Sequence, residues 1–99
     1  MMMSGKKTNY RAKRSFVIAN ERGLHTRPSA ELVKCASSFK SSIHLVHQDL
    51  TINAKSLLGV LMLAAARGTR LSVEAEGEDA EEAVATIVDL ARNKFNIHY

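Results

Sequence analysis

Polar and apolar residues alternate strictly between Arg70 and Glu76, and this pattern constrains the fold more than any other feature of the chain. Successive side chains of a β-strand point to opposite faces, so Leu71, Val73 and Ala75 share one face of a predicted strand. The residues between them are polar or charged and fall on the other face. The strand therefore belongs to a sheet with one buried face and one face in water.

Three amphipathic segments can cover the buried face of such a sheet. Their apolar residues recur at spacings of three and four, which predicts helices over residues 28–39, 57–67 and 80–94. Pro28 suits a first helical turn, and Ser56 and Asp79 are N-cap side chains. Glu82 completes a capping box with Asp79, and Gly68 marks the end of the second helix.

Three shorter segments predict the remaining strands. Residues 15–19 form a short apolar run, and residues 42–45 and 50–53 alternate on either side of a polar turn, which predicts a hairpin. The element order is therefore βαββαβα. We expect an α+β open-faced sandwich, with a four-stranded, mainly antiparallel sheet and three helices on one face.

The net charge of +4 is concentrated at the start of the chain. Residues 1–14 hold five basic groups and no acid, which predicts a disordered basic extension before a domain over 15–99. That domain has nine basic and ten acidic groups, so we expect no nucleic-acid partner. Cys35 has no partner cysteine and falls on an apolar stripe, and no segment predicts membrane insertion or a secretion signal. We expect a cytoplasmic monomer.

The segment 23–30 places chemistry at the start of a predicted helix. His25 precedes the helix, Arg27 follows two residues later, and unpaired N–H groups with the helix dipole favour an anion there. An imidazole at this position can attack phosphorus, and the guanidinium can bind the phosphoryl group. Thr26 and Ser29 add hydroxyl groups that can also serve the helix start. A histidine before a helix is more often a surface or packing residue, and only its neighbours favour the chemical role.

Two segments resemble the signatures of a known family. The run Gly23-Leu24-His25-Thr26-Arg27-Pro28-Ser29-Ala30 is similar to the active-site signature of HPr, the histidine-containing phosphocarrier of the phosphoenolpyruvate-dependent phosphotransferase system. The run Asn53-Ala54-Lys55-Ser56-Leu57-Leu58-Gly59-Val60-Leu61 resembles the second signature of that family, around a regulatory serine. The resemblance covers about residues 15–94.

The resemblance implies roles for individual residues. His25 would carry a phosphoryl group on Nδ1, which it receives from enzyme I and passes to enzyme IIA domains. Arg27 and the following N–H groups would stabilise that group. Ser56 would be phosphorylated from ATP by a dedicated kinase/phosphorylase, although it can equally be a plain N-cap. No cofactor is implied, and the chain's histidines lack the ligand spacing of a metal site.

The second predicted helix holds more apolar residues than one narrow stripe can bury. In the family, this helix and the one that starts near Pro28 form the docking surface for partners. The predicted partner-binding residues are Thr26, Leu57, Leu58 and Leu61, although core packing is the alternative for each leucine.

Three alternative functions remain open. The chain could be a nitrogen-related member that does not transport sugar, or a purely regulatory relative that works by protein binding. It could also be a small nucleic-acid-binding domain recruited by the basic extension. Regulatory relatives typically lack the active histidine, so His25 together with Arg27 favours the carrier, and the balanced charge of the domain disfavours nucleic acid.

Overall fold

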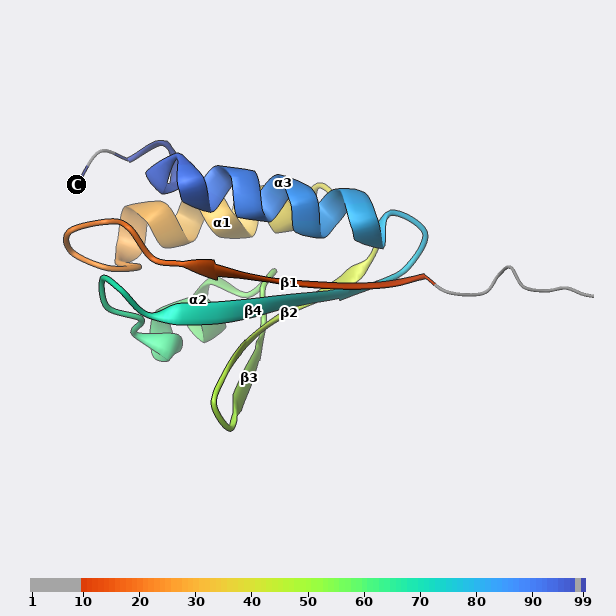
Figure 1. Ribbon diagram of the computed structural model, residues 1–99, viewed down its shortest axis with the longest axis horizontal. Helices are drawn as coiled ribbons and strands as arrows, with labels where there is room; N and C mark the ends of the chain where they lie inside the picture. The colour runs from red at the N-terminus through yellow and green to blue at the C-terminus, as the bar shows by residue number, and fades with distance from the viewer. Residues whose placement is uncertain (1–9, 98) are drawn as a thin grey trace, which may run out of the picture.

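The alternating segment is strand β4 (Arg70–Glu76), and it lies inside the sheet. The computed structural model describes residues 10–97 and 99. β4 pairs antiparallel with β1 (Arg11–Val17) on one side and with β2 (Ser42–His47) on the other. β3 (Leu50–Asn53) pairs with β2, which gives the strand order β1-β4-β2-β3 (Figure 1).

Three α-helices cover one face of this sheet, as the element order predicts. Helices α1 (Thr26–Ser37) and α3 (Ala80–Arg92) lie next to each other along the sheet (Figure 1). The shorter α2 (Leu57–Leu63) packs against β3 and α1. A turn of 3₁₀-helix, η2 (Lys94–Asn96), follows α3 and contacts α1. The expected α+β open-faced sandwich is confirmed.

The core lies between the helices and the buried face of the sheet. Leu71, Val73 and Ala75 of β4 are at most 4% exposed, as their alternation predicts. Phe95 of η2 is fully buried, and its ring meets that of Phe16 edge-on with 6.4 Å between centroids. The segment after α3 is therefore part of the core.

β1 begins four residues earlier than the sequence predicts. Residues 11–14 pair with β4 like the rest of the strand, and on the open face Arg11 lies 3.4 Å from Glu76 and Lys13 lies 3.6 Å from Glu74. Two of the basic charges that indicated an extension, those of Arg11 and Lys13, thus lie opposite acidic ones. The expected boundary between residues 14 and 15 falls inside a strand, and residues 1–9 lie outside the described residues.

The helix ends also differ from the predicted ones. α1 begins at Thr26, two residues before Pro28, and ends at Ser37. α2 ends at Leu63 because Ala64 takes a left-handed conformation with φ of 50°, well before Gly68. The N-cap residue of α3 is Asp79, but its side chain does not bond to the helix, so the expected capping box is absent.

Candidate functional site

His25 is the N-cap residue of α1, at the end of the loop that follows β1. The N–H of Ser29 donates to the His25 carbonyl at 2.9 Å and makes the first turn of the helix. The first N–H groups of a helix have no partner within it, and because Pro28 has no N–H, the free ones here are those of Thr26 and Arg27. The first turn holds no acidic residue. This helix start therefore presents N–H groups and positive potential next to the imidazole.

The loop before His25 is held against the segment that follows α2. Gly23 has φ of +72°, and a Cβ built on it would lie 2.5 Å from the carbonyl oxygen of Ala65. Leu24 donates its N–H to the same oxygen at 2.8 Å. The buried Ser29 hydroxyl donates to the Leu24 carbonyl at 2.9 Å, so this hydroxyl supports the loop. Contacts of the residues before and after His25 in the sequence therefore fix its position.

The imidazole of His25 contacts Tyr99. Nε2 lies 3.3 Å from the backbone oxygen of Tyr99, and the two rings are 5.5 Å apart between centroids with a tilt of 31°. An oxygen acceptor favours the tautomer with its proton on Nε2. In that tautomer Nδ1 holds the lone pair and can act as the nucleophile.

Arg27, like His25, contacts Tyr99. Its Nη1 donates to the Tyr99 hydroxyl oxygen at 2.6 Å, and its Cζ lies 5.7 Å from the centre of the Tyr99 ring. Arg22 of the preceding loop approaches this ring at 5.6 Å. His25 and Arg27 thus both contact Tyr99, and Arg22 approaches the same ring. The sequence carries no signal for Tyr99, because it follows His25 by 74 residues and matches no spacing.

Asn20 anchors the segment that carries Tyr99. Its side-chain nitrogen lies 3.0 Å from the carbonyl oxygens of Lys94 and Ile97 and 3.4 Å from that of Tyr99. Asn20 is fully buried and Ile97 is nearly so. Figure 1 places this end of the chain near the loop between β1 and α1. The carboxyl-terminal segment therefore forms one wall of the site.

Ser56 is the N-cap of α2, as predicted, and its hydroxyl accepts the N–H of Gly59 at 3.1 Å. Lys55 ties this end of α2 to the end of α1, because its Nζ donates to the Phe39 carbonyl at 2.8 Å. The opposite end of α2 leads to Ala65, which bonds to the loop before His25. The seven residues of α2, about 10 Å of helix, thus lie between the Ser56 cap and the segment that contacts the loop before His25.

The outer side of α2 is apolar and exposed. Leu58 and Met62 lie one turn apart, so they share a side of the helix, and each is 70% exposed. Leu57 is 39% exposed, and Leu61 is less exposed than Leu57. Sequence reasoning selected the three leucines and passed over Met62, although the apolar excess of this helix includes it. We refer to Leu57, Leu58, Leu61 and Met62 as the α2 patch.

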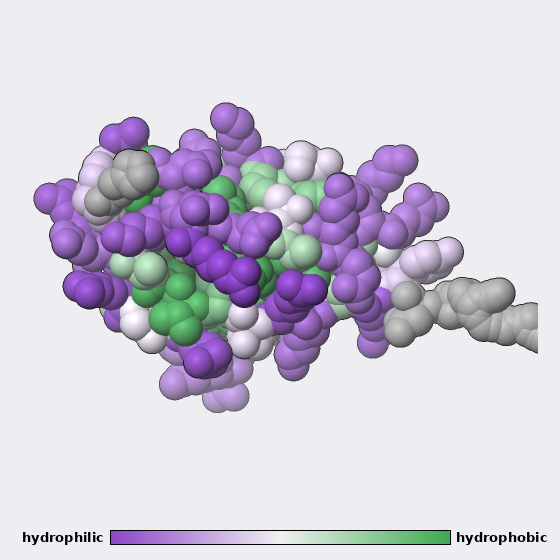
Figure 2. Space-filling model, turned by 45° about the horizontal axis from the view of Figure 1, so that its top comes forward, coloured by the Kyte–Doolittle hydropathy of each residue, from purple (hydrophilic) through white to green (hydrophobic). Residues whose placement is uncertain are grey.

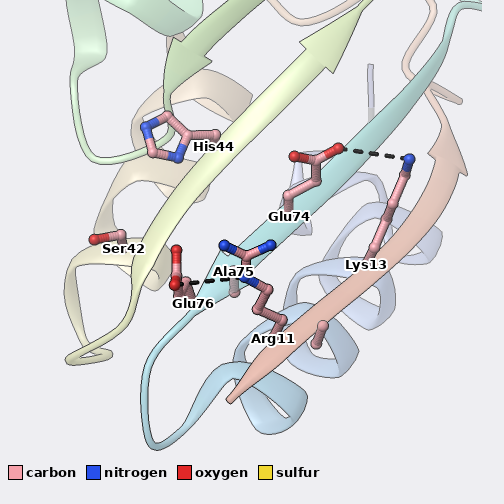
Figure 3. A pocket seen from close by; sticks show the side chains of 8 residues that line it. Arg11, Lys13, Ser42, His44, Glu74, Ala75 and Glu76 are labelled. Atoms are coloured by element: carbon pink, nitrogen blue, oxygen red, sulfur yellow. Dashed lines mark ion pairs between the residues drawn. The ribbon is translucent and has the colours of Figure 1, made fainter. Parts of the chain in front are cut away.

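Outside the α2 patch, the large hydrophobic side chains that the described residues expose are Tyr10, Val17 and Leu50. On the face shown in Figure 2, hydrophilic side chains predominate and hydrophobic ones emerge in limited areas. A shallow hollow of about 440 Å³ crosses the open face of the sheet, where Ser42 and His44 lie near two ion pairs that join β1 to β4 (Figure 3). None of the predicted site residues lines this hollow.

Three further observations concern features outside the site. Cys35 is a free thiol packed against the core, and burial raises its pKa. Within residues 10–97 and 99, no group of three or more His, Cys, Asp or Glu side chains could hold a metal ion. No helix in the described part of the chain has the length and apolar character to cross a membrane.

Comparison with known proteins identifies the family. The family model described as the PTS HPr component phosphorylation site matches residues 12–93. The phosphocarrier protein HPr of Neisseria meningitidis is 41% identical over 83 residues, which are 84% of this chain and 93% of that protein. HPr of Xylella fastidiosa is 40% identical over 81 residues, covering 82% and 91%.

Solved structures agree with the sequence relatives. A crystal structure of HPr from Thermoanaerobacter tengcongensis superposes with a TM-score of 0.84 at 38% identity, covering 89% of this chain and 99% of that one. The catabolite repression protein Crh of Bacillus subtilis, described as a domain-swapped dimer, superposes with a TM-score of 0.68 at 32% identity, covering 93% and 97%. With its sequence signatures, fold and matched length in agreement, this chain belongs to the HPr family of phosphocarrier proteins of the phosphotransferase system.

Proposed function

We propose that this chain accepts a phosphoryl group from phospho-enzyme I on Nδ1 of His25 and passes it to an enzyme IIA domain. The observation that carries the proposal is the position of the imidazole. His25 is the N-cap residue of α1, and its Nε2 faces the backbone oxygen of Tyr99. This contact favours a lone pair on Nδ1 at a helix start that attracts anions.

The transfer step needs few groups from the chain. The Nδ1 lone pair attacks phosphorus, the bond between phosphorus and the donor breaks, and its electron pair stays with the donor. The proton on Nε2 remains in place. The amides of Thr26 and Arg27 and the Arg27 guanidinium then face the added negative charge. Passing the group to an acceptor reverses these steps with a new nucleophile.

The start of α1 and the α2 patch together form the proposed docking surface. Thr26 is exposed beside His25, and Leu58 and Met62 offer apolar area on α2. A partner that covers both elements would bury these side chains and exclude water from the phosphoryl group. The proposed carrier is a monomer. We propose the cytoplasm as the place where it meets these partners.

Ser56 is the proposed regulatory site. Its hydroxyl caps α2 and is partly exposed at the end of the α2 patch. A phosphoryl group there adds a charge of about −1.5 to −2, which a helix start tolerates and an acidic partner surface repels. Phosphorylation by a kinase/phosphorylase would therefore weaken docking through the α2 patch while leaving the chemistry of His25 intact.

The decisive experiment is phosphorylation with purified enzyme I and phosphoenolpyruvate. We expect the wild type to gain one acid-labile phosphoryl group and His25→Ala to gain none, measured by intact mass before and after mild acid. His44→Ala is the matched control, because His44 lies on the open face of the sheet, and it should label like the wild type.

Two results would contradict this role. Undiminished labelling of His25→Ala would remove His25 from the mechanism. A wild type that enzyme I does not phosphorylate, but that a kinase modifies on Ser56, would favour the purely regulatory alternative.

A further inference from the structure

We infer that Tyr99 is a positioning residue for phosphoryl transfer, acting through Arg27. Its hydroxyl oxygen accepts a hydrogen bond from Arg27, and its ring lies against the His25 imidazole. Among the described residues, these contacts join the proposed acceptor and the proposed phosphate-binding side chain through one residue. The inference rests on the proposed function and adds a residue that neither signature contains.

Arg27 needs such a support because its side chain is long and exposed at the helix start. A free guanidinium samples many rotamers, and ordering it during transfer costs conformational entropy. The Tyr99 hydroxyl restrains Nη1 before the phosphoryl group arrives. One of the five guanidinium N–H groups is used, so four remain for phosphoryl oxygens. The phenol thus restricts Arg27 and leaves most of its binding capacity.

The position of Tyr99 is itself well determined. Its backbone oxygen lies within hydrogen-bond distance of His25 Nε2 and of the buried Asn20 side chain. Two cations, Arg22 and Arg27, approach its ring at 5.6 and 5.7 Å and are attracted to it. The backbone and the side chain of Tyr99 therefore bind different parts of the site, which allows their effects to be separated by substitution.

Tyr99→Phe keeps the ring and the backbone and removes only the hydroxyl. We expect kcat for phosphorylation by enzyme I to fall about three- to tenfold, while the KM of enzyme I for this protein stays unchanged. The reason is that a lost hydrogen bond to a charged group should act on the transition state. The matched control is Tyr10→Phe, the same change at an exposed tyrosine just before β1, which should transfer at the wild-type rate.

A double-mutant cycle tests whether the hydroxyl acts through Arg27. In an Arg27→Ala background, Tyr99→Phe should have no further effect on kcat, because its hydrogen-bond donor is already missing. Nuclear magnetic resonance provides a readout that does not depend on transfer. Rotation of the Arg27 guanidinium should be faster in Tyr99→Phe than in the wild type and unchanged in Tyr10→Phe.

Several outcomes would overturn the inference. An unchanged kcat in Tyr99→Phe would overturn it. A higher kcat would also overturn it, because it would mean that the phenol competes with phosphate for Arg27. An equal loss of kcat in the Arg27→Ala background, or unchanged guanidinium rotation, would also refute it. These results differ from failure of the proposed function, in which the wild type itself would accept no phosphoryl group and the role of Tyr99 would be lost with it.

Discussion

Gly23 sets the position of His25 from two residues away. Its φ of +72° lies in the left-handed region, and its Cα faces the backbone of residues 65 and 66 closely enough that a Cβ would meet atoms at 2.5 and 2.9 Å. Gly68 also has a positive φ, +88°, but nothing lies within 4 Å of a Cβ built there. A side chain at Gly68 would therefore meet backbone strain alone, whereas one at Gly23 would meet both strain and steric overlap.

Alanine substitution at these glycines should give unequal losses. We expect Gly68→Ala to lower the free energy of unfolding by about 1–2 kcal/mol, the cost of a left-handed alanine. Gly23→Ala should lose more and should also slow phosphorylation of His25, since the loop must move away from Ala65. Chemical denaturation and labelling by enzyme I measure the two effects. Equal losses at both positions would argue against the close approach.

At the residue scale, the sequence predicts what is local. His25, Arg27 and Pro28 are adjacent, so their relation to a helix start is legible without a structure. The contacts of Tyr99 and Asn20 join positions more than 70 residues apart and depend on how the last segment packs. No periodicity or capping rule reports such a relation.

Ser56 has a measurable structural role at the scale of the helix. Ser56→Ala should cost about 1 kcal/mol of unfolding free energy, because Gly59 loses its side-chain acceptor. Ser56→Asp should keep the stability, since a carboxylate accepts the same N–H, but should raise KM for enzyme I by repelling an acidic surface. The effect should shrink in about 1 M salt, where screening acts over about 3 Å. Equal KM values at low salt would leave Ser56 with a capping role only.

Asp79 joins two elements instead of capping its own helix. Its carboxylate accepts hydrogen bonds from the Ser41 hydroxyl and from the backbone N–H groups of Lys40 and Ser41. The Ser41 hydroxyl, followed by the Lys40 N–H, holds the pKa of Asp79 below its ordinary value. The loop between α1 and β2 is thereby tied to the start of α3.

This contact should make stability depend on pH. Because the folded-state pKa is lowered, the carboxylate stabilises the fold above the unfolded-state pKa, and this contribution is lost as pH falls through the folded-state value. Wild type should therefore be more stable than Asp79→Asn at pH 7, with a gap that narrows below about pH 4. Asp49→Asn, in the exposed hairpin turn, is the control. A gap that stays constant from pH 7 to pH 3 would contradict the assignment.

The elements that the sequence misplaces share a physical cause. Local rules correctly place the Ser56 cap and the alternation in β4. They fail at Asp79, where a tertiary acceptor role replaces the local cap, and at Ala64, where the chain leaves the helix early so that Ala65 can bond to Leu24. In both places a contact between distant segments outweighs the local propensity.

At the scale of the whole molecule, the limits of the sheet depend on partners that composition does not reveal. Residues 11–14 look like an extension because they are basic, yet they pair with the second half of β4, whose exposed face is acidic. The ladder hydrogen bonds hold this segment, while its exposed ion pairs contribute little. Charge indicates only that a side chain is exposed to solvent. The charged side chains of this segment are exposed, and its backbone is nevertheless paired in the sheet.

Truncation distinguishes the two boundaries. A chain that starts at Tyr10 keeps all of β1, whereas a chain that starts at Ser15 loses four of its seven paired residues and the bond from the Gly77 N–H to the Tyr10 carbonyl. At about 1 kcal/mol for each lost ladder hydrogen bond, the shorter chain should be less stable by about 2–4 kcal/mol. Urea denaturation of both chains measures this difference. Phe16 and its contact with Phe95 remain in both, so the loss reports the edge of the sheet together with the partly buried Ala12. Equal stability would place the start of the domain at Ser15.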